Sequence, residues 1–83
     1  MQTVFIDGRK IIVEGDFVSI GLDMGLEGND LLDFEHYNIY LEAYRQMYNY
    51  HLELGNEKEV EYYGDLMRNC LKNINNLKGW FCG

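Results

Sequence analysis

One long stretch, from Asn29 to Gly55, constrains the fold of this chain most, because its apolar residues repeat with the period of an α-helix. It holds five of the seven tyrosines. At about 100° per residue, one face carries Phe34, Tyr37, Tyr40, Leu41, Tyr44, Met47, Tyr48 and Leu52, flanked by Ile39, Ala43 and Tyr50. This arc exceeds half of the circumference. We therefore expect the helix to contact both a sheet and a second helix, and any uncovered part to be available to a partner.

The ends of this helix have their own signals. Asn29 or Asp30 can cap its start, and Asp30, Asp33 and Glu35 place negative charge near the positive end of the helix dipole. Gly55 can adopt the left-handed conformation that ends a helix. The sequence therefore predicts a helix over 29–55.

A second helix is predicted over 56–78, between the cap residue Asn56 and the stop at Gly79. Gly64 lies at the edge of its apolar stripe and is expected to let the first helix approach closely. The link Gly55-Asn56 is so short that the two helices should form an antiparallel hairpin. The stripe consists of Val60, Tyr63, Met67, Cys70, Leu71, Ile74 and Leu77.

Part of this hairpin resembles a known repeat. The run YNYHLELGNEKEVEYYGDLMRNCLKNI is similar to the helix-turn-helix of a tetratricopeptide repeat, with Leu54, Gly55 and Asn56 at the turn and Tyr62 and Tyr63 in the second helix. It covers about a third of the chain, and one copy is present where such arrays need several. We interpret the resemblance as shared packing geometry.

The first 28 residues predict a three-stranded antiparallel β-meander. Asp7-Gly8 suits a type I′ turn, which sets Ile6 opposite Arg9, Val4 opposite Ile11 and Gln2 opposite Val13. A second turn at Gly15-Asp16 would set Val13 opposite Val18, Ile11 opposite Ile20 and Arg9 opposite Leu22. Both turns place the same apolar residues on one face, which should pack on the helices. On the other face Phe5, Ile12 and Phe17 would form an exposed patch.

The chain should therefore be a single α+β domain over 1–83, with the helical hairpin packed on one face of the meander. Its parts are the meander with an acidic, glycine-rich connector (1–28), the two helices (29–55 and 56–78) and a tail (79–83). No apolar run is long enough to span a membrane, and the start lacks the features of a secretion signal. Because Cys70 and Cys82 are too few for a disulfide framework, we expect a cytoplasmic protein.

Charge is distributed unevenly along the chain, whose net charge is −7. No basic residue lies between Lys10 and Arg45, an interval that holds eight acids. Direct binding to nucleic acid or to an anionic membrane is disfavoured, because phosphate contacts need clustered lysines and arginines. A basic protein surface is the expected partner. The predicted partner-binding residues are Glu14, Asp16, Asp23, Glu27, Asp30, Asp33, Glu35 and Glu42, together with Tyr50.

Candidates for catalysis and metal binding are few. Ser19 would lie in the middle of a strand and not on an exposed turn, which disfavours a Ser-His-Asp arrangement. Cys70 and His51 could form a thiolate pair, but both fall on apolar helix faces. No histidine or cysteine pair has the short spacing of a zinc site. We therefore predict no enzyme activity and no catalytic, cofactor-binding or metal-binding residues.

Two functions fit these properties. In size, acidity and lack of catalytic groups, the chain is similar to the small inhibitors that phages make against host defences, such as anti-CRISPR proteins. That resemblance implies a phage or mobile-element protein that blocks a basic nucleic-acid-binding surface of its partner. The alternative is a homodimeric structural or adaptor module that uses the surplus aromatic face of the first helix or the patch of Phe5, Ile12 and Phe17.

Overall fold

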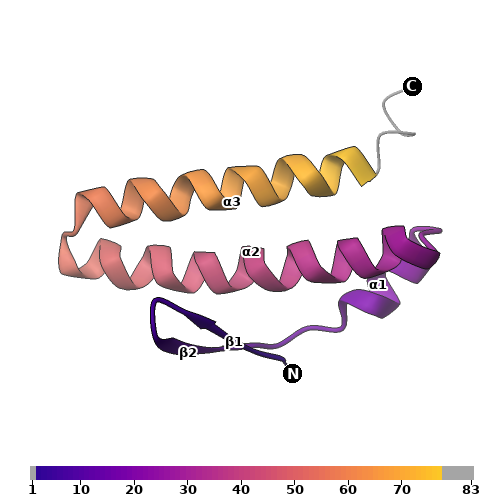
Figure 1. Ribbon diagram of the computed structural model, residues 1–83, viewed down its shortest axis with the longest axis horizontal. Coiled ribbons are helices and arrows are strands. Elements are labelled where there is room, and N and C mark those ends of the chain that lie inside the picture. Colours follow the sequence, from indigo (N-terminus) through magenta and orange to yellow (C-terminus); the bar gives the residue numbers. More distant parts are fainter. Residues whose placement is uncertain (1, 78–83) are drawn as a thin grey trace.

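The computed structural model describes residues 2–77 and has an α+β fold. In chain order its elements are β1 (Gln2–Ile6), β2 (Arg9–Val13), α1 (Phe17–Asp23), α2 (Gly28–Leu54) and α3 (Glu57–Leu77). The two long helices run side by side, the β-hairpin lies against one half of α2, and α1 lies against its other end (Figure 1). The predicted tail and Lys78 fall outside the described residues.

The β-hairpin has the predicted register. Gln2 pairs with Val13, Val4 with Ile11, and Ile6 with Arg9. Asp7 and Gly8 have φ angles of 51° and 78°, and positive values at both central positions are what a type I′ turn requires. Turn chemistry and alternation of apolar residues agreed here, and the prediction is confirmed.

The predicted third strand is wrong. Within the described residues 2–77 the sheet has two strands, and residues 17–23 form the helix α1. Asp16 caps this helix, because its Oδ1 accepts a hydrogen bond of 3.1 Å from the backbone N–H of Ser19. Ile20 and Leu22, which were expected on the buried face of the sheet, are 48% and 55% exposed.

The helical hairpin is confirmed, and its elements are shifted from the prediction by about one residue, which is the usual uncertainty of helix ends. Gly55 has φ 76°, its N–H bonds the Leu52 carbonyl, and the Asn56 N–H bonds the His51 carbonyl, which is the Schellman pattern. The predicted cap at Asn29 or Asp30 is wrong. Helix α2 begins at Gly28, and Glu27 stands at the N-cap position without a side-chain hydrogen bond.

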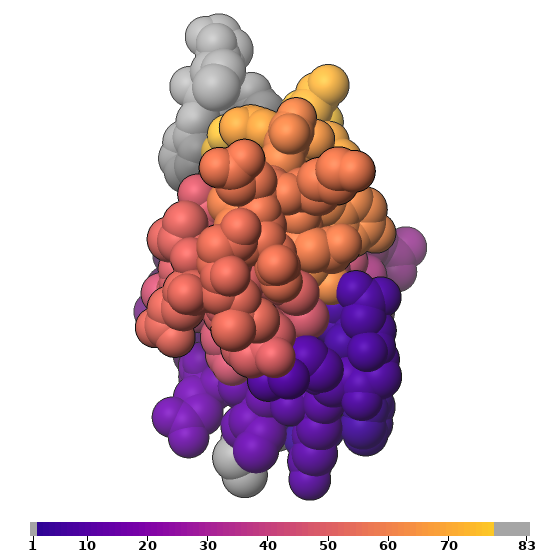
Figure 2. Space-filling view, turned by 90° about the vertical axis from the view of Figure 1, so that its left-hand side faces the viewer, coloured from indigo at the N-terminus to yellow at the C-terminus, as the bar shows by residue number. Residues whose placement is uncertain are grey.

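Helix α2 is the centre of the core, as its broad apolar arc predicts. Viewed from the α2–α3 turn, α3 lies above α2 and the indigo β-hairpin lies below it (Figure 2). One cluster joins the sheet to both helices and consists of Ile11, Val13, Ile39, Ala43, Met47 and Tyr63. A second joins the α1–α2 connection to the helices through Leu26, Phe34 and Ile74.

Some side chains depart from the predicted faces. Ile39 and Ala43, expected at the flank, are buried, whereas Leu52 and Leu71 are 56% and 47% exposed. Phe17 belongs to α1 and packs against both core clusters, so it does not join an exposed patch. Phe5 is 70% exposed, as expected for the outer face of the sheet.

Candidate protein-binding site

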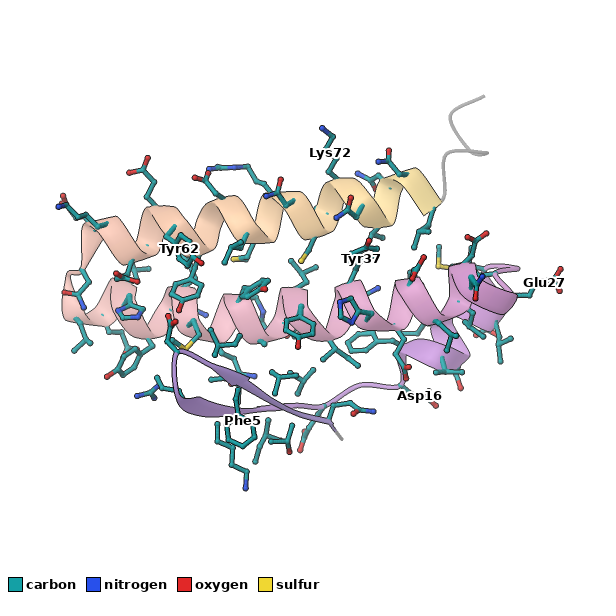
Figure 3. The ribbon with its side chains drawn as sticks, viewed as in Figure 1. Phe5, Asp16, Glu27, Tyr37, Tyr62 and Lys72 are labelled. Atoms are coloured by element: carbon teal, nitrogen blue, oxygen red, sulfur yellow. The ribbon has the colours of Figure 1, made fainter. Side chains whose placement is uncertain are left out.

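The acidic residues of the interval 14–42 are distributed over three places. Asp23, Glu27, Asp30 and Asp33 are all exposed at the α1–α2 connection and the first turns of α2, and we call these four residues the acidic end. Glu27 projects from the far end of the molecule, beyond α1 (Figure 3). Glu14 and Asp16 lie on the loop before α1, and Glu35 and Glu42 lie further along α2.

Helix geometry separates the acids of α2 into two groups. At about 100° per residue, Asp30 and Asp33 differ by roughly 60° around the helix axis. Glu35 stands roughly 140° from Asp30, and Glu42 shares the side of Glu35. The predicted set is therefore not one continuous face. The acidic end is compact, and the other members are lateral to it.

The loop acid Asp16 is held in place by its role as a cap. Its carboxylate accepts hydrogen bonds from the Ser19 backbone N–H and from the Ser19 hydroxyl, the latter at 2.7 Å. These bonds, led by the one from the hydroxyl, lower the pKa of Asp16 below its usual value. Asp16 therefore stays charged at neutral pH and remains exposed to a partner.

Few cations neutralise these acids. Arg45 donates to Glu42 from Nη2 at 2.6 Å and from Nε at 3.2 Å, and this contact raises the pKa of Arg45. Arg68 pairs with Asp65 within its own helix. Lys72 projects outward from α3, away from α2 (Figure 3). Among residues 2–77, no ion pair is formed by any acid of the acidic end.

Tyr50, which was predicted to bind the partner together with the acids, lies far from the acidic end. It lies about 30 Å along α2 from Asp30 at a rise of about 1.5 Å per residue. The guanidinium of Arg9 covers its ring, with Cζ 3.9 Å from the ring centroid, and the side chain is 38% exposed. Tyr50 thus fastens the β-hairpin to α2.

Other chemistry-bearing groups are used for packing. Cys70 is buried, and burial raises the pKa of its thiol, which disfavours a thiolate at neutral pH. His51 stacks on Tyr63, with ring centroids 5.7 Å apart. Ser19 lies in the first turn of α1 and not in a strand, which corrects its predicted position. In the described part of the chain, no group of three histidine, cysteine or acidic side chains could hold a metal ion.

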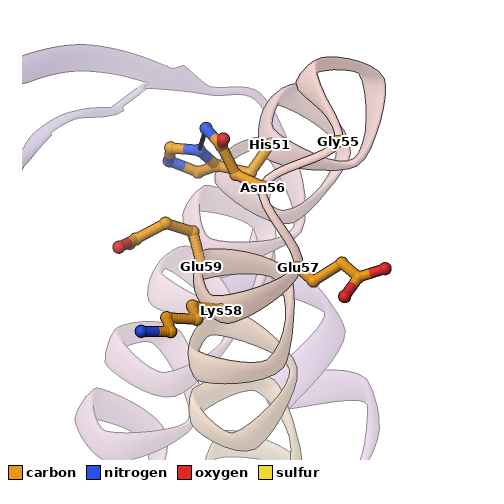
Figure 4. A pocket seen from close by; sticks show the side chains of 6 residues that line it. All are labelled: His51, Gly55, Asn56, Glu57, Lys58 and Glu59. Atoms are coloured by element: carbon orange, nitrogen blue, oxygen red, sulfur yellow. Dashed lines mark hydrogen bonds between the residues drawn. The ribbon is translucent and has the colours of Figure 1, made fainter.

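A second surface, which the sequence did not suggest, is an open pocket at the α2–α3 turn (Figure 4). Asn56 Nδ2 lies 3.1 Å from His51 Nδ1 there. The Glu57 side chain points away from those of Lys58 and Glu59 (Figure 4). Because these charged groups diverge, the pocket does not present a converging set of ligands.

Comparisons with known proteins add no relatives. No family model matches the sequence, and neither the curated proteins nor the solved structures contain a match. No family match therefore supports the resemblance of the helical hairpin to a tetratricopeptide repeat. In the described residues, no helix combines the length and apolar character needed to cross a membrane.

Proposed function

We propose that the protein is a small, acidic, non-enzymatic inhibitor that docks onto a basic nucleic-acid-binding surface of a partner protein. The observation that carries this proposal is the acidic end: four exposed carboxylates, at the extremity of the molecule, that form no ion pair among residues 2–77. Glu14, Asp16 and Glu35 extend the charge laterally. Glu42 contributes less, because Arg45 neutralises it.

The physical basis is imitation of a phosphate backbone. Carboxylates on a connection and the first turns of a helix present repeated negative charge, and a nucleic-acid channel is lined with lysine and arginine. Complementary charge speeds the encounter and fixes the orientation of the complex. The inhibitor would then occupy the channel and exclude the nucleic acid, which is the mode of action that its resemblance to anti-CRISPR proteins implies.

The test begins with capture of partners from a native lysate at low and at high salt, followed by competition with duplex DNA. The inhibitor proposal expects a nucleic-acid-processing enzyme that is released by salt and displaced by DNA. Partners that are indifferent to both treatments would count against nucleic-acid mimicry.

A pair of charge-reversal variants then locates the contact. Asp23, Glu27 and Asp30 are changed to lysine in one variant, and Glu57, Glu59 and Glu61 in the other. Both variants have the same net charge. The first reverses acids in the acidic end, which includes the start of α2, and the second reverses acids in the first turns of α3. Capture should be lost with the first variant and kept with the second. Equal loss in both would show that only net charge matters.

The homodimeric adaptor is the second candidate, and one observation favours a form of it. The tyrosines expected to be surplus on α2 are partly buried against other elements, as Tyr44 and Tyr48 illustrate. Phe5, in contrast, is 70% exposed on the outer face of the sheet. Self-association would therefore use the β-hairpin and not the helix.

A further inference from the structure

The outer edge of β1 presents free backbone groups. In an antiparallel hairpin with a two-residue turn, the pair next to the turn exchanges two backbone hydrogen bonds, and every second pair after it does so too. That pair is Ile6–Arg9, so the N–H and C=O groups of Thr3 and Phe5 point to the outer side of β1. Among residues 2–77 these groups make no hydrogen bond across that edge.

The opposite edge of the hairpin supports this assignment. The same alternation directs the Ile12 carbonyl outward from β2, and Gln46 Nε2 of α2 donates to it at 2.9 Å. Helix α2 therefore covers part of the β2 edge. In the space-filling view the indigo hairpin forms the lower right margin of the molecule (Figure 2).

The composition of β1 favours strand pairing. Proteins protect exposed edge strands with charged residues and proline. The sequence of β1, QTVFI, has neither. Phe5 is 70% exposed and projects away from the helices (Figure 3). An uncharged edge strand with an exposed aromatic side chain is suited to receive another strand.

We propose that β1 pairs with β1 of a second copy of this chain, antiparallel and about a two-fold axis at Val4. Thr3 of each copy then lies opposite Phe5 of the other. All the outward backbone groups of Thr3 and Phe5 become hydrogen-bonded, and the two hairpins form one continuous four-stranded sheet. The two Phe5 side chains become diagonal neighbours on its outer face, a separation that aromatic rings can bridge.

The uncharged β1 strand suits a second copy, because no like charges then face each other across the new pair, and the distribution of charge favours the antiparallel orientation. The acidic end lies beyond the open end of the hairpin, whereas Arg9 and Lys10 lie next to its turn (Figure 1). Antiparallel pairing places the acidic ends of the two copies at opposite ends of the assembly. The two acidic ends are then separated by much more than the Debye length, so they do not oppose pairing, whereas parallel pairing would bring them together.

The interface would be small. The edge strand has five residues, and Phe5 can contribute at most on the order of 150 Å² to the buried area. A stable interface of standard size buries about 800 Å² per partner. We therefore expect a monomer–dimer equilibrium that depends on protein concentration. The dimer leaves the acidic end exposed, so this proposal does not depend on the proposed inhibitor function.

Sedimentation equilibrium of the full chain across a wide range of concentrations tests the proposal. The mass should rise from one copy toward two. Thr3→Pro, which removes an outward N–H, and Phe5→Lys should each weaken association at least about tenfold. Ile12→Lys is the matched control, because it puts the same charge on the same outer face but on β2, and it should still associate.

Amide hydrogen exchange of the unaltered protein gives a second measurement that needs no variant. Exchange at Thr3 and Phe5 should slow as concentration rises, while exchange at exposed amides elsewhere stays constant. A monomer at every concentration overturns the proposal. A dimer that forms without slowing exchange at Thr3 and Phe5, or that Ile12→Lys disrupts as strongly as Thr3→Pro, also overturns it.

Discussion

The hydroxyl of Tyr63 in α3 donates a hydrogen bond to the carboxylate of Asp7 in the β-hairpin turn, across 56 positions of the sequence. Tyr63 is 0% exposed, and its ring contacts the rings of His51 and Tyr44. Asp7 therefore has two roles, since it also adopts the positive φ of the turn. This contact connects the first strands directly to the last helix.

Removing the donor tests this connection. Tyr63→Phe keeps the buried ring but loses the hydroxyl, so the free energy of unfolding should fall by about 1 kcal/mol. Urea denaturation followed by circular dichroism measures the change. Tyr62→Phe is the control, because Tyr62 is 54% exposed and the same deletion there should change little. Equal effects of the two substitutions would mean that the bond to Asp7 contributes nothing.

The same contact predicts a loss of stability at alkaline pH. Burial, followed by the bond to Asp7, raises the pKa of Tyr63 above its ordinary value of 10.0. A group whose pKa is higher in the folded state stabilises the fold fully below its unfolded pKa, and this stability is lost as the pH rises above that value. The free energy of unfolding should fall above pH 10.0, and less steeply in Tyr63→Phe. The same slope in both proteins would contradict the assignment.

Two helical glycines should respond in opposite ways to alanine. A Cβ at Gly21 would lie 2.5 Å from Leu31 Cδ1 and 3.1 Å from Phe34 Cδ2, so Gly21→Ala should destabilise the fold by about 1–3 kcal/mol. A Cβ at Gly64 would lie 3.5 Å from Tyr48 Cε2, an ordinary contact. Gly64→Ala should therefore stabilise by up to about 1 kcal/mol through helix propensity. Thermal denaturation compares the two, and stabilisation by Gly21→Ala would disprove the close approach.

The cap of α1 should depend on the charge of Asp16. Because its pKa is lowered in the folded state, its contribution is present above the ordinary value of 3.8 and disappears as the pH falls through the folded value. Asp16→Ala should speed amide exchange in α1. The effect should be largest at Ser19, whose N–H donates a hydrogen bond to the Asp16 carboxylate. Asp16→Asn should preserve much of the protection. Unchanged exchange at Ser19 in Asp16→Ala would show that the cap does not hold the helix.

The error over α1 has an identifiable cause. Val18, Ile20 and Leu22 alternate with polar residues and glycine as they would in a strand, but over so few residues this pattern does not separate strand from helix. A signal for the helix was present in Asp16 and Ser19, a capping residue followed three positions later by its hydrogen-bond donor. The buried residue of α1 is Gly21, which no hydrophobicity pattern would select.

The candidate site was only partly predictable. The acidic interval is readable directly, because charge is a property of composition and order. The separation of Asp30 from Glu35 was also predictable, because both lie in the predicted helix and about 100° per residue puts them on different sides of it. The position of Asp23 was not predictable, because it ends α1, a helix that was not predicted. Tyr50, which flanks the apolar face of the predicted helix, was predicted to bind a partner, but the Arg9 guanidinium lies over its ring.

By itself the sequence determined the β-hairpin register and the antiparallel helical hairpin. The Asp7-Gly8 and Gly55 positions impose particular backbone angles, and such angles depend only on neighbouring residues. Tertiary structure alone decided that Asp7 binds Tyr63 and that the Arg9 guanidinium lies over the Tyr50 ring. These features depend on contacts between residues far apart in the chain, for which local sequence carries no signal.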